Sequence, residues 1–236
     1  MGKISIVENS LKAIVVLMFA GVSFYIITGF STLMMADDYC YFSLTKNSGF
    51  FPALIDSYTS AVVIAGNRFS ATLLSILVPY IGIDSIKFVP LVMVISLISS
   101  VLLLVQISLS LFELKPNIKV SLTISLLFSS IIFYIAPSQF QNIYWFSGVI
   151  AYTTPLIFYT FVLLLYFSML REKSYAIWKL LLILFISIVT AGFSETSAVA
   201  FWVHFFLIIM MLKMVKLVKM SDPKIYLPIV GLSIGI

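Results

Sequence analysis

Two adjacent aspartates, Asp37 and Asp38, come directly after a long and almost wholly apolar segment. The chain has only nine acidic residues, so a neighbouring pair at the edge of a membrane segment requires an explanation. On a helix that starts here, Asp37 and Tyr41 share a face because they are four residues apart, while Asp38 points about 100° away. We therefore expect the two carboxylates to have different roles. One could act as a general base, and the alternative is that an aspartate caps the helix.

The segment "GNRFS" (66–70) contains Arg68, one of two arginines in the chain. A planar and permanently charged guanidinium is suited to bind a phosphate or a carboxylate. There are two simpler alternatives. Arg68 could lie at the membrane interface with its charged end in water, or it could form an ion pair with Asp37 or Asp38.

The segment "QNIYWFSGVIAYTTP" (141–155) combines aromatic and amide side chains. Aromatic faces can stack on the apolar faces of sugars or on prenyl chains, and amides can form hydrogen bonds with hydroxyl groups. The alternative is an ordinary aromatic belt at the membrane interface. The candidate binding residues in this segment are Gln141, Asn142, Tyr144, Trp145 and Tyr152.

Glu195, in "GFSETS" (192–197), lies at the junction of two apolar segments. A carboxylate is costly there unless it is solvated or paired, so it often marks a site or a pathway. The alternative is that Glu195 caps the helix that follows it. His204, on the opposite face of that helix, is expected to form a hydrogen bond between helices. The sequence contains no HExxH, Walker or GxSxG motif and no Cys/His cluster, so hydrolase and nucleotide-driven activities have no support.

The elements that must position these residues are membrane helices. The chain is 62% hydrophobic and only 10% charged, whereas soluble domains carry roughly 25% charged residues. Because backbone polar groups in lipid must be paired within their own segment, helices are the expected structure. We expect one all-α transmembrane bundle over residues 1–236, incomplete at its C-terminus, with about six to seven spans. The expected spans are 11–35, 88–112, 120–136, 152–170, 176–193 and 196–212, followed by a partial segment from residue 225.

Residues 36–87 are expected to form a first external loop that contains interfacial helices. Within it, "FFPALIDSYTSAVVIAG" suits a short helix that lies on the membrane, begins after Gly49 and stops at Gly66. Residues 69–83 are short for a span, so they could either cross the membrane or lie along its surface.

The distribution of positive charge bears on the orientation of the chain. With the N-terminus inside and residues 69–83 not crossing, eleven of the fourteen Lys and Arg residues lie on the cytoplasmic side, and the opposite arrangement gives the same count. Lysines before the first span and aspartates after it favour a cytoplasmic N-terminus. In that arrangement Asp37, Asp38, Arg68, the aromatic segment and Glu195 share the external compartment of a plasma or inner membrane.

These features together resemble the GT-C superfamily, and in particular a bacterial branch of it. The resemblance rests on a first span that ends in Asp37–Asp38, a long loop that closes on "NRF", the segment "YWFSGVIAYTTP" and a later glutamate, and it covers about residues 11–200. Members of this superfamily are polytopic glycosyltransferases that use polyprenyl-phosphate sugars. The chain departs from the pattern in having "GNRF" in place of "GR", and in lacking the later spans and the C-terminal domain that such enzymes often have.

The resemblance implies an inverting glycosyltransferase that moves a sugar from a polyprenyl phosphate to a hydroxyl of a glycan, lipid or protein acceptor. Asp37 would be the base, while Asp38 would orient it or help to hold a divalent cation. Arg68 would stabilise the departing phosphate. The aromatic and amide residues of 141–152 would line a sugar or lipid slot, and Glu195 would bind the acceptor or the donor. Membrane lipids are the other expected partners, and nucleic acid is not expected.

Two other functions remain open from the sequence. A transporter or flippase of lipid-linked sugars or other solutes would use the acidic residues for ion coupling. Such residues are expected near the middle of the bilayer, whereas here they lie at the ends of spans. The second alternative is a non-catalytic membrane subunit.

Overall fold

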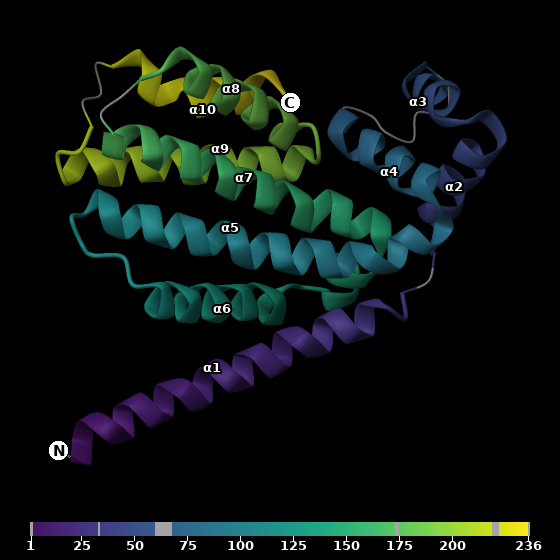
Figure 1. The fold of residues 1–236 in the computed structure, drawn as a ribbon. Helices are drawn as coiled ribbons and strands as arrows, with labels where there is room; N and C mark the ends of the chain where they lie inside the picture. Colours follow the sequence, from purple (N-terminus) through teal and green to yellow (C-terminus); the bar gives the residue numbers. More distant parts are fainter. Residues whose placement is uncertain (1, 33, 60–67, 173–174, 219–221, 236) are drawn as a thin grey trace.

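The computed structural model describes residues 2–32, 34–59, 68–172, 175–218 and 222–235, with side chains from residue 12 onward. Within these ranges all regular secondary structure is helical (Figure 1). Long helices run between two ends of the molecule, which confirms the predicted helical bundle. They are α1 (Gly2–Gly29), α5 (Val89–Leu111), α6 (Ile118–Ile135), α7 (Phe146–Glu172) and α9 (Glu195–Met214).

In the part of the chain that the structure describes, five helices are long and apolar enough to cross a membrane, namely the long helices just listed. Three further apolar helices among the described residues are shorter. One covers residues 69–81, and the other two are α8 (Ile177–Ala191), with 15 residues, and α10 (Leu227–Ile234), with 8. At 1.5 Å per residue α8 and α10 are roughly 22 Å and 12 Å long, which is less than the roughly 30 Å of a hydrocarbon core. The described residues therefore support five spans and not the expected six to seven, because α8 and α10 are too short to be counted.

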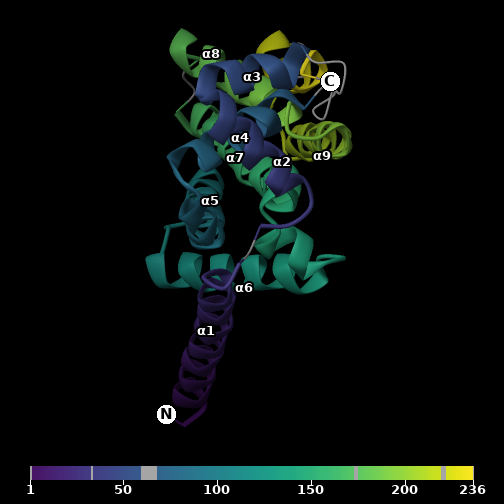
Figure 2. The same cartoon turned by 90° about the vertical axis from the view of Figure 1, so that its right-hand side faces the viewer.

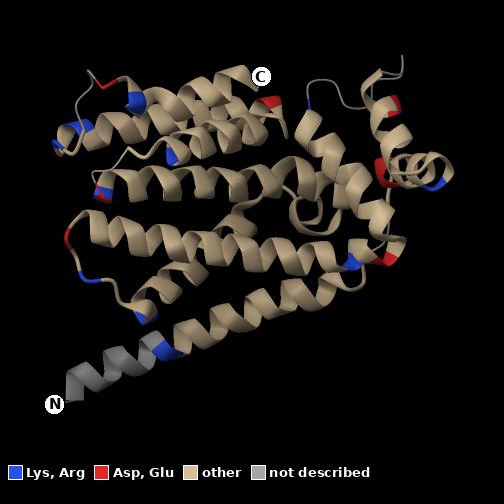
Figure 3. Ribbon diagram, turned by 45° about the horizontal axis from the view of Figure 1, so that its top comes forward, with Lys and Arg blue, Asp and Glu red and all other residues tan. Residues whose placement is uncertain are grey.

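Charged residues lie at the two ends of the bundle (Figure 3). Between those ends the long helices are almost free of acidic and basic residues, as a membrane protein requires. At one end, the largely buried Lys179 at the start of α8 pairs with Glu172 at the end of α7. Asp37, Arg68 and Glu195 lie at the opposite end.

The first predicted loop folds into three short helices at that opposite end (Figure 1). They are α2 (Asp37–Ser48), α3 (Phe50–Thr59) and α4 (Phe69–Ile81), and the short 3-10 helix η1 (Ile83–Phe88) then leads into α5. The helix predicted after Gly49 does begin at Phe50, while its predicted end at Gly66 lies outside the described residues. Because α4 packs on α2 and α3, residues 69–83 stay at the end where α1 finishes and α5 starts. This is the arrangement expected if they do not cross.

The helix α7 lies between α5 and α8 and is the most buried of the long helices. Its contact with α5 includes a hydrogen bond in which Thr160 donates to the Ser100 hydroxyl at 2.8 Å. By contrast, α1 contacts α5 and α6 but extends away from the bundle toward its N-terminus (Figure 2). The core therefore centres on α7, and the segments that begin and end it are held firmly.

Small residues allow α8 and α10 to approach closely. Gly231 of α10 faces Ser187 of α8, and Gly235 faces Ala191, so a small residue on each helix meets one on the other. A Cβ atom at Gly231 would lie 2.5 Å from the Ser187 Cβ. Membrane helices commonly use small residues four apart for this kind of contact.

Replacing Gly231 with alanine is expected to lower the free energy of unfolding by about 1–3 kcal/mol, the usual cost of overpacking. Gly21→Ala is the matched control, because a Cβ there meets nothing within 4 Å, and we expect it to be neutral or slightly stabilising. Thermal unfolding in detergent, followed by size-exclusion chromatography, measures both variants. Equal stability of the two would contradict the close packing of α8 on α10.

Candidate active site

A cavity of about 110 Å³ lies where α2, α4 and the start of α7 meet. We call it the α2/α4/α7 cavity. It brings together Asp37, Arg68, Trp145 and Tyr152, four of the residues that the sequence singled out. The complete lining consists of Asp37, Tyr41, Arg68, Ala71, Thr72, Ser75, Trp145, Ser147, Gly148, Ala151 and Tyr152.

Asp37 and Tyr41 both line the cavity from α2, as their four-residue spacing predicted. Asp37 is exposed, and among the described residues it has no hydrogen-bond or ion-pair partner. Burial, reinforced by the negative charge of Asp37, raises the pKa of Tyr41. The phenol therefore stays neutral and can donate a hydrogen bond into the cavity.

Asp38 is fully buried, does not line the cavity, and contacts the first turn of α7. One of its oxygens, Oδ1, accepts hydrogen bonds from the Ser147 backbone N–H at 3.0 Å and from the Ser147 hydroxyl at 2.5 Å. The other, Oδ2, accepts from the Met35 N–H at 3.0 Å. A carboxylate in this position caps the N-terminus of α7 and is stabilised by its helix dipole.

The capping alternative thus describes Asp38, although the helix that it caps is α7 rather than its own. No hydrogen bond joins Asp38 to Asp37, both of which the structure describes. That Asp38 orients the base stays an expectation, and any such effect acts through the backbone of α2. Asp38 fixes α2 against α7, and so sets the position from which Asp37 faces the cavity.

Arg68 forms an ion pair with Glu195, with 3.0 Å between Nε and Oε2. This pair joins the start of α4 to the start of α9, and both side chains are about half exposed. Arg68 also lines the cavity, whereas Glu195 does not. The partner of Arg68 is thus neither of the aspartates considered above, and Glu195 contacts the arginine instead of the cavity.

The start of α4 is held from two sides, which fixes the position of Arg68. The Gly192 carbonyl, in the turn between α8 and α9, accepts hydrogen bonds from the backbone N–H groups of Ser70 and Ala71 at 2.9 and 3.4 Å. The Tyr58 hydroxyl of α3 donates to the Phe69 carbonyl at 2.5 Å. The Gly192 carbonyl pairs two backbone N–H groups that the start of a helix otherwise leaves unpaired.

The aromatic side of the cavity comes from the junction before α7. A single π-helical turn, η2 (Phe140–Tyr144), precedes α7, and Gly148 lets that turn pack closely because a Cβ there would clash with Trp145 and with the Gln141 carbonyl. The Trp145 Nε1 is buried and has no hydrogen-bond partner in the described part of the chain. Tyr152 is 48% exposed and lies at the rim of the cavity.

Three of the predicted binding residues do not line this cavity. Tyr144 packs with the apolar cluster between α1, α5 and α6, and Gln141 is exposed. The Asn142 amide donates to the Ser138 carbonyl at 2.7 Å. The span expected over 152–170 begins six residues earlier, since α7 starts at Phe146. Because η2 turns toward α1, residues before and after Trp145 face different parts of the molecule.

Other cavity residues were missed by the sequence argument. Thr72 and Ser75 line the cavity together with Arg68 from the same face of α4. Their spacing (68, 72 and 75) is a helical repeat that could have indicated this shared face. The role of Ser147 had no comparable signal, because its contact with Asp38 spans 109 residues of sequence.

The arrangement offers hydrogen-bonding and charged groups of both signs. Among the described residues, no three His, Cys, Asp or Glu side chains cluster in a way that could hold a metal ion. Both oxygens of Asp38 already accept hydrogen bonds, so Asp37 is the carboxylate that faces the cavity. The divalent cation remains an expectation from the resemblance.

No protein-family model, curated protein or solved structure matches this chain. The function therefore has to be argued from the chemistry of the cavity and from its place in a membrane bundle.

Proposed function

We propose that this chain is a membrane-embedded glycosyltransferase of the GT-C type. It would transfer a sugar from a polyprenyl phosphate to a hydroxyl of a glycan, lipid or protein acceptor, with inversion. The observation that carries the proposal is the shared cavity of Asp37 and Arg68, with Trp145 and Tyr152 beside them. A base, a phosphate-binding cation and aromatic surfaces for a sugar are the groups that this reaction needs.

In the proposed reaction, the Asp37 carboxylate takes the proton of the acceptor hydroxyl while the hydroxyl oxygen attacks the anomeric carbon. The bond between that carbon and the phosphate oxygen breaks on the opposite face, and the phosphate leaves with the electron pair. Arg68 stabilises the negative charge that develops on the phosphate. Trp145 and Tyr152 position the sugar by contact with its apolar faces.

The size of the cavity limits which part of the donor it holds. Its volume of about 110 Å³ is smaller than the roughly 300–1,000 Å³ of pockets that enclose a drug-sized ligand. We therefore assign the reacting phosphate and sugar to the cavity. The polyprenyl chain would lie outside it, along the apolar surface of the bundle.

Glu195 acts in this proposal through Arg68. Glu195→Gln is expected to lower kcat/KM about tenfold, which corresponds to ~1.4 kcal/mol, because the uncharged amide holds the guanidinium less firmly. The measurement is a double-mutant cycle with Arg68→Ala. If Glu195 only positions Arg68, the double variant should have the same kcat/KM as Arg68→Ala alone. If the losses of kcat/KM in the two single variants add in the double variant, Glu195 does not act through Arg68.

We propose a plasma or inner membrane location, with a cytoplasmic N-terminus and the α2/α4/α7 cavity external. In a Cys40→Ser background, single cysteines at Asn47 and Gln141 are expected to react with a membrane-impermeant maleimide added to intact cells. Both residues are exposed in the structure and lie at the cavity end. Lys115→Cys, between α5 and α6, is the control and should react only after permeabilisation. Reaction at only one of the first two sites would contradict a shared compartment.

The proposed function is tested with the full-length protein in lipid nanodiscs and radiolabelled polyprenyl-phosphate sugars. We expect protein-dependent transfer of label to a hydroxyl acceptor from membrane extracts, with inverted anomeric configuration. The same protein in sealed vesicles tests the transporter alternative, for which label would cross the membrane without a new glycosidic bond. Absence of transfer with every donor would overturn the proposal.

A further inference from the structure

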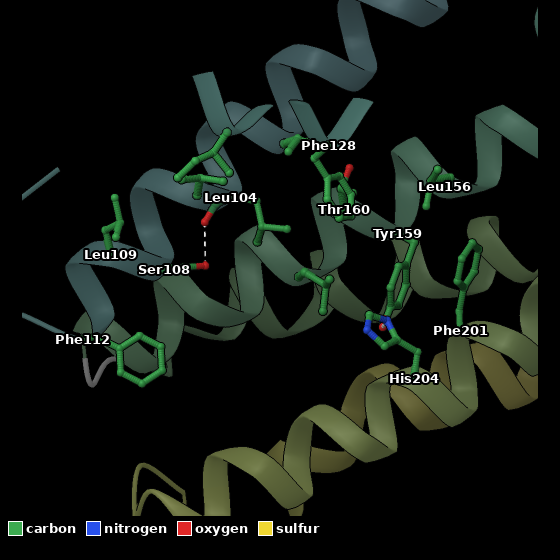
Figure 4. A pocket seen from close by; sticks show the side chains of 14 residues that line it. Leu104, Ser108, Leu109, Phe112, Phe128, Leu156, Tyr159, Thr160, Phe201 and His204 are labelled. Carbon is green, nitrogen blue, oxygen red and sulfur yellow. Dashed lines mark hydrogen bonds between the residues drawn. The ribbon is translucent and has the colours of Figure 1, made fainter. Parts of the chain in front are cut away.

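A second and larger cavity, of about 370 Å³, lies among α5, α6, α7 and α9 (Figure 4). Its walls are almost entirely apolar, with Leu104, Phe128 and Leu163 among them. None of the residues that line it is Asp, Glu, Lys or Arg. This volume is in the range of pockets that bind small molecules, roughly 300–1,000 Å³.

The cavity opens between α6 and α9. Phe128 of α6 is 51% exposed, and His204 of α9 is also exposed. Both residues lie within helices that are long and apolar enough to span a membrane. A molecule that enters would therefore come from the hydrocarbon of the bilayer.

One polar pair interrupts the apolar wall. The hydroxyl of the buried Tyr159 lies 3.0 Å from His204 Nδ1. Phe201 stacks on the Tyr159 ring with 4.3 Å between the ring centroids. Figure 4 shows Tyr159 and His204 pointing toward one another at the cavity wall. These contacts fix the orientation of the imidazole ring.

The other hydroxyl groups of the cavity already have partners. Ser108 donates to the Leu104 carbonyl at 2.7 Å (Figure 4), and Thr160 donates to Ser100. In contrast, His204 Nε2 has no hydrogen-bond partner in the described part of the chain. An imidazole nitrogen in a hydrocarbon environment is costly without such a partner.

These observations define the chemistry of a ligand. Its body must be apolar to match the walls, and it must carry an oxygen that pairs with His204 Nε2. A phosphate or carboxylate would lack a permanently charged partner, because no Lys or Arg lines the cavity. A hydroxyl group can both donate and accept, so it fits either tautomer of the histidine.

We propose that this cavity binds a neutral lipid alcohol, with its hydrocarbon chain against the apolar walls and its hydroxyl hydrogen-bonded to His204 Nε2. This site shares no lining residue with the α2/α4/α7 cavity. Its occupancy therefore does not depend on the proposed transfer reaction.

The test uses the full-length protein in nanodiscs and three photoreactive probes with the same diazirine-bearing chain: an alcohol, a hydrocarbon and a phosphate monoester. The alcohol is expected to label peptides of α7 and α9 about fivefold more than the hydrocarbon does, which is the typical gain from one hydrogen bond. Excess unlabelled long-chain alcohol should abolish this labelling. Stronger labelling by the phosphate probe would overturn the assignment to a neutral lipid.

Two variants distinguish the contribution of the His204 hydrogen bond to probe labelling from the contribution of the apolar cavity. His204→Phe keeps a ring in place and should remove the advantage of the alcohol, while labelling by the hydrocarbon stays unchanged. Leu104→Trp fills the cavity and should reduce labelling by both probes. The control is Leu17→Trp on α1, where the residue is 72% exposed and does not line the cavity. If excess unlabelled alcohol does not reduce the labelling and Leu104→Trp does not change it, the probes only contact the lipid-facing surface in a general way. That result would overturn the proposal.

Discussion

Replacing Asp37 with asparagine is expected to lower the rate of sugar transfer about 10²–10⁴-fold, the usual contribution of a general base. Asparagine has nearly the same shape as aspartate but cannot take the proton of the acceptor hydroxyl. Because Asp37 is exposed and has no partner among the described residues, the variant should fold like the wild type. Single-turnover transfer in nanodiscs measures the chemical step without product release.

The matched control for this variant is Asp56→Asn. Asp56 is an exposed aspartate of α3 that does not line the cavity, so its substitution should leave transfer unchanged. A rate near that of the wild type in Asp37→Asn would rule out Asp37 as the base. An equal loss in both variants would point to a general effect of charge at this end of the molecule.

Asp38→Ala is expected to act on stability and not on the chemical step. The substitution leaves the backbone N–H groups of Met35 and Ser147 without their acceptor. A buried donor that loses its partner costs about 1–3 kcal/mol. Because both hydrogen bonds are only partly buried, we expect the free energy of unfolding to fall by about 1–3 kcal/mol in total. Thermal unfolding in detergent measures this loss.

Asp84→Ala provides the comparison, because Asp84 is exposed and pairs only with Lys87. Surface pairs of this kind contribute roughly 0–1 kcal/mol. Asp38→Asn keeps one acceptor oxygen and should fall between the two alanine variants. If Asp38→Ala were as stable as Asp84→Ala, Asp38 would not hold α2 against α7.

The general architecture could be predicted because it depends on composition and local spacing. The scarcity of charge predicts membrane helices, and the spacing of Asp37 and Tyr41 places both on the face that lines the cavity. Gly49 has a φ of 78°, a conformation that glycine adopts without strain, and it marks the predicted start of α3. Each of these inferences involves residues that are near one another in the sequence.

The tertiary pairings could not be predicted, because they join distant segments. Asp38 meets Ser147 across 109 residues, and Arg68 meets Glu195 across 127. The sequence identified three of these four residues but not their partners. Spacing within a segment carries no information about which helix ends meet in the folded chain.

The residue at which α7 begins also could not be predicted from the sequence. Its aromatic, glycine and proline residues are typical of an interfacial loop, but α7 includes both Gly148 and Pro155. Gly148 lies against η2, so its lack of a side chain serves helix packing and not a turn. Tyr152, expected as the first residue of the span 152–170, lies in the second turn of α7 and reaches the cavity from there.

The central claim is that the reacting part of the sugar donor binds in the α2/α4/α7 cavity. In a Cys40→Ser background, Tyr152→Cys places a thiol at the rim of that cavity, and its rate of reaction with a maleimide reports whether the cavity is occupied. With polyprenyl-phosphate sugar at ten times its Kd, the rate at this position should fall about tenfold, while the rate at Gln141→Cys should not change. An unchanged rate at Tyr152→Cys with saturating donor would contradict the claim.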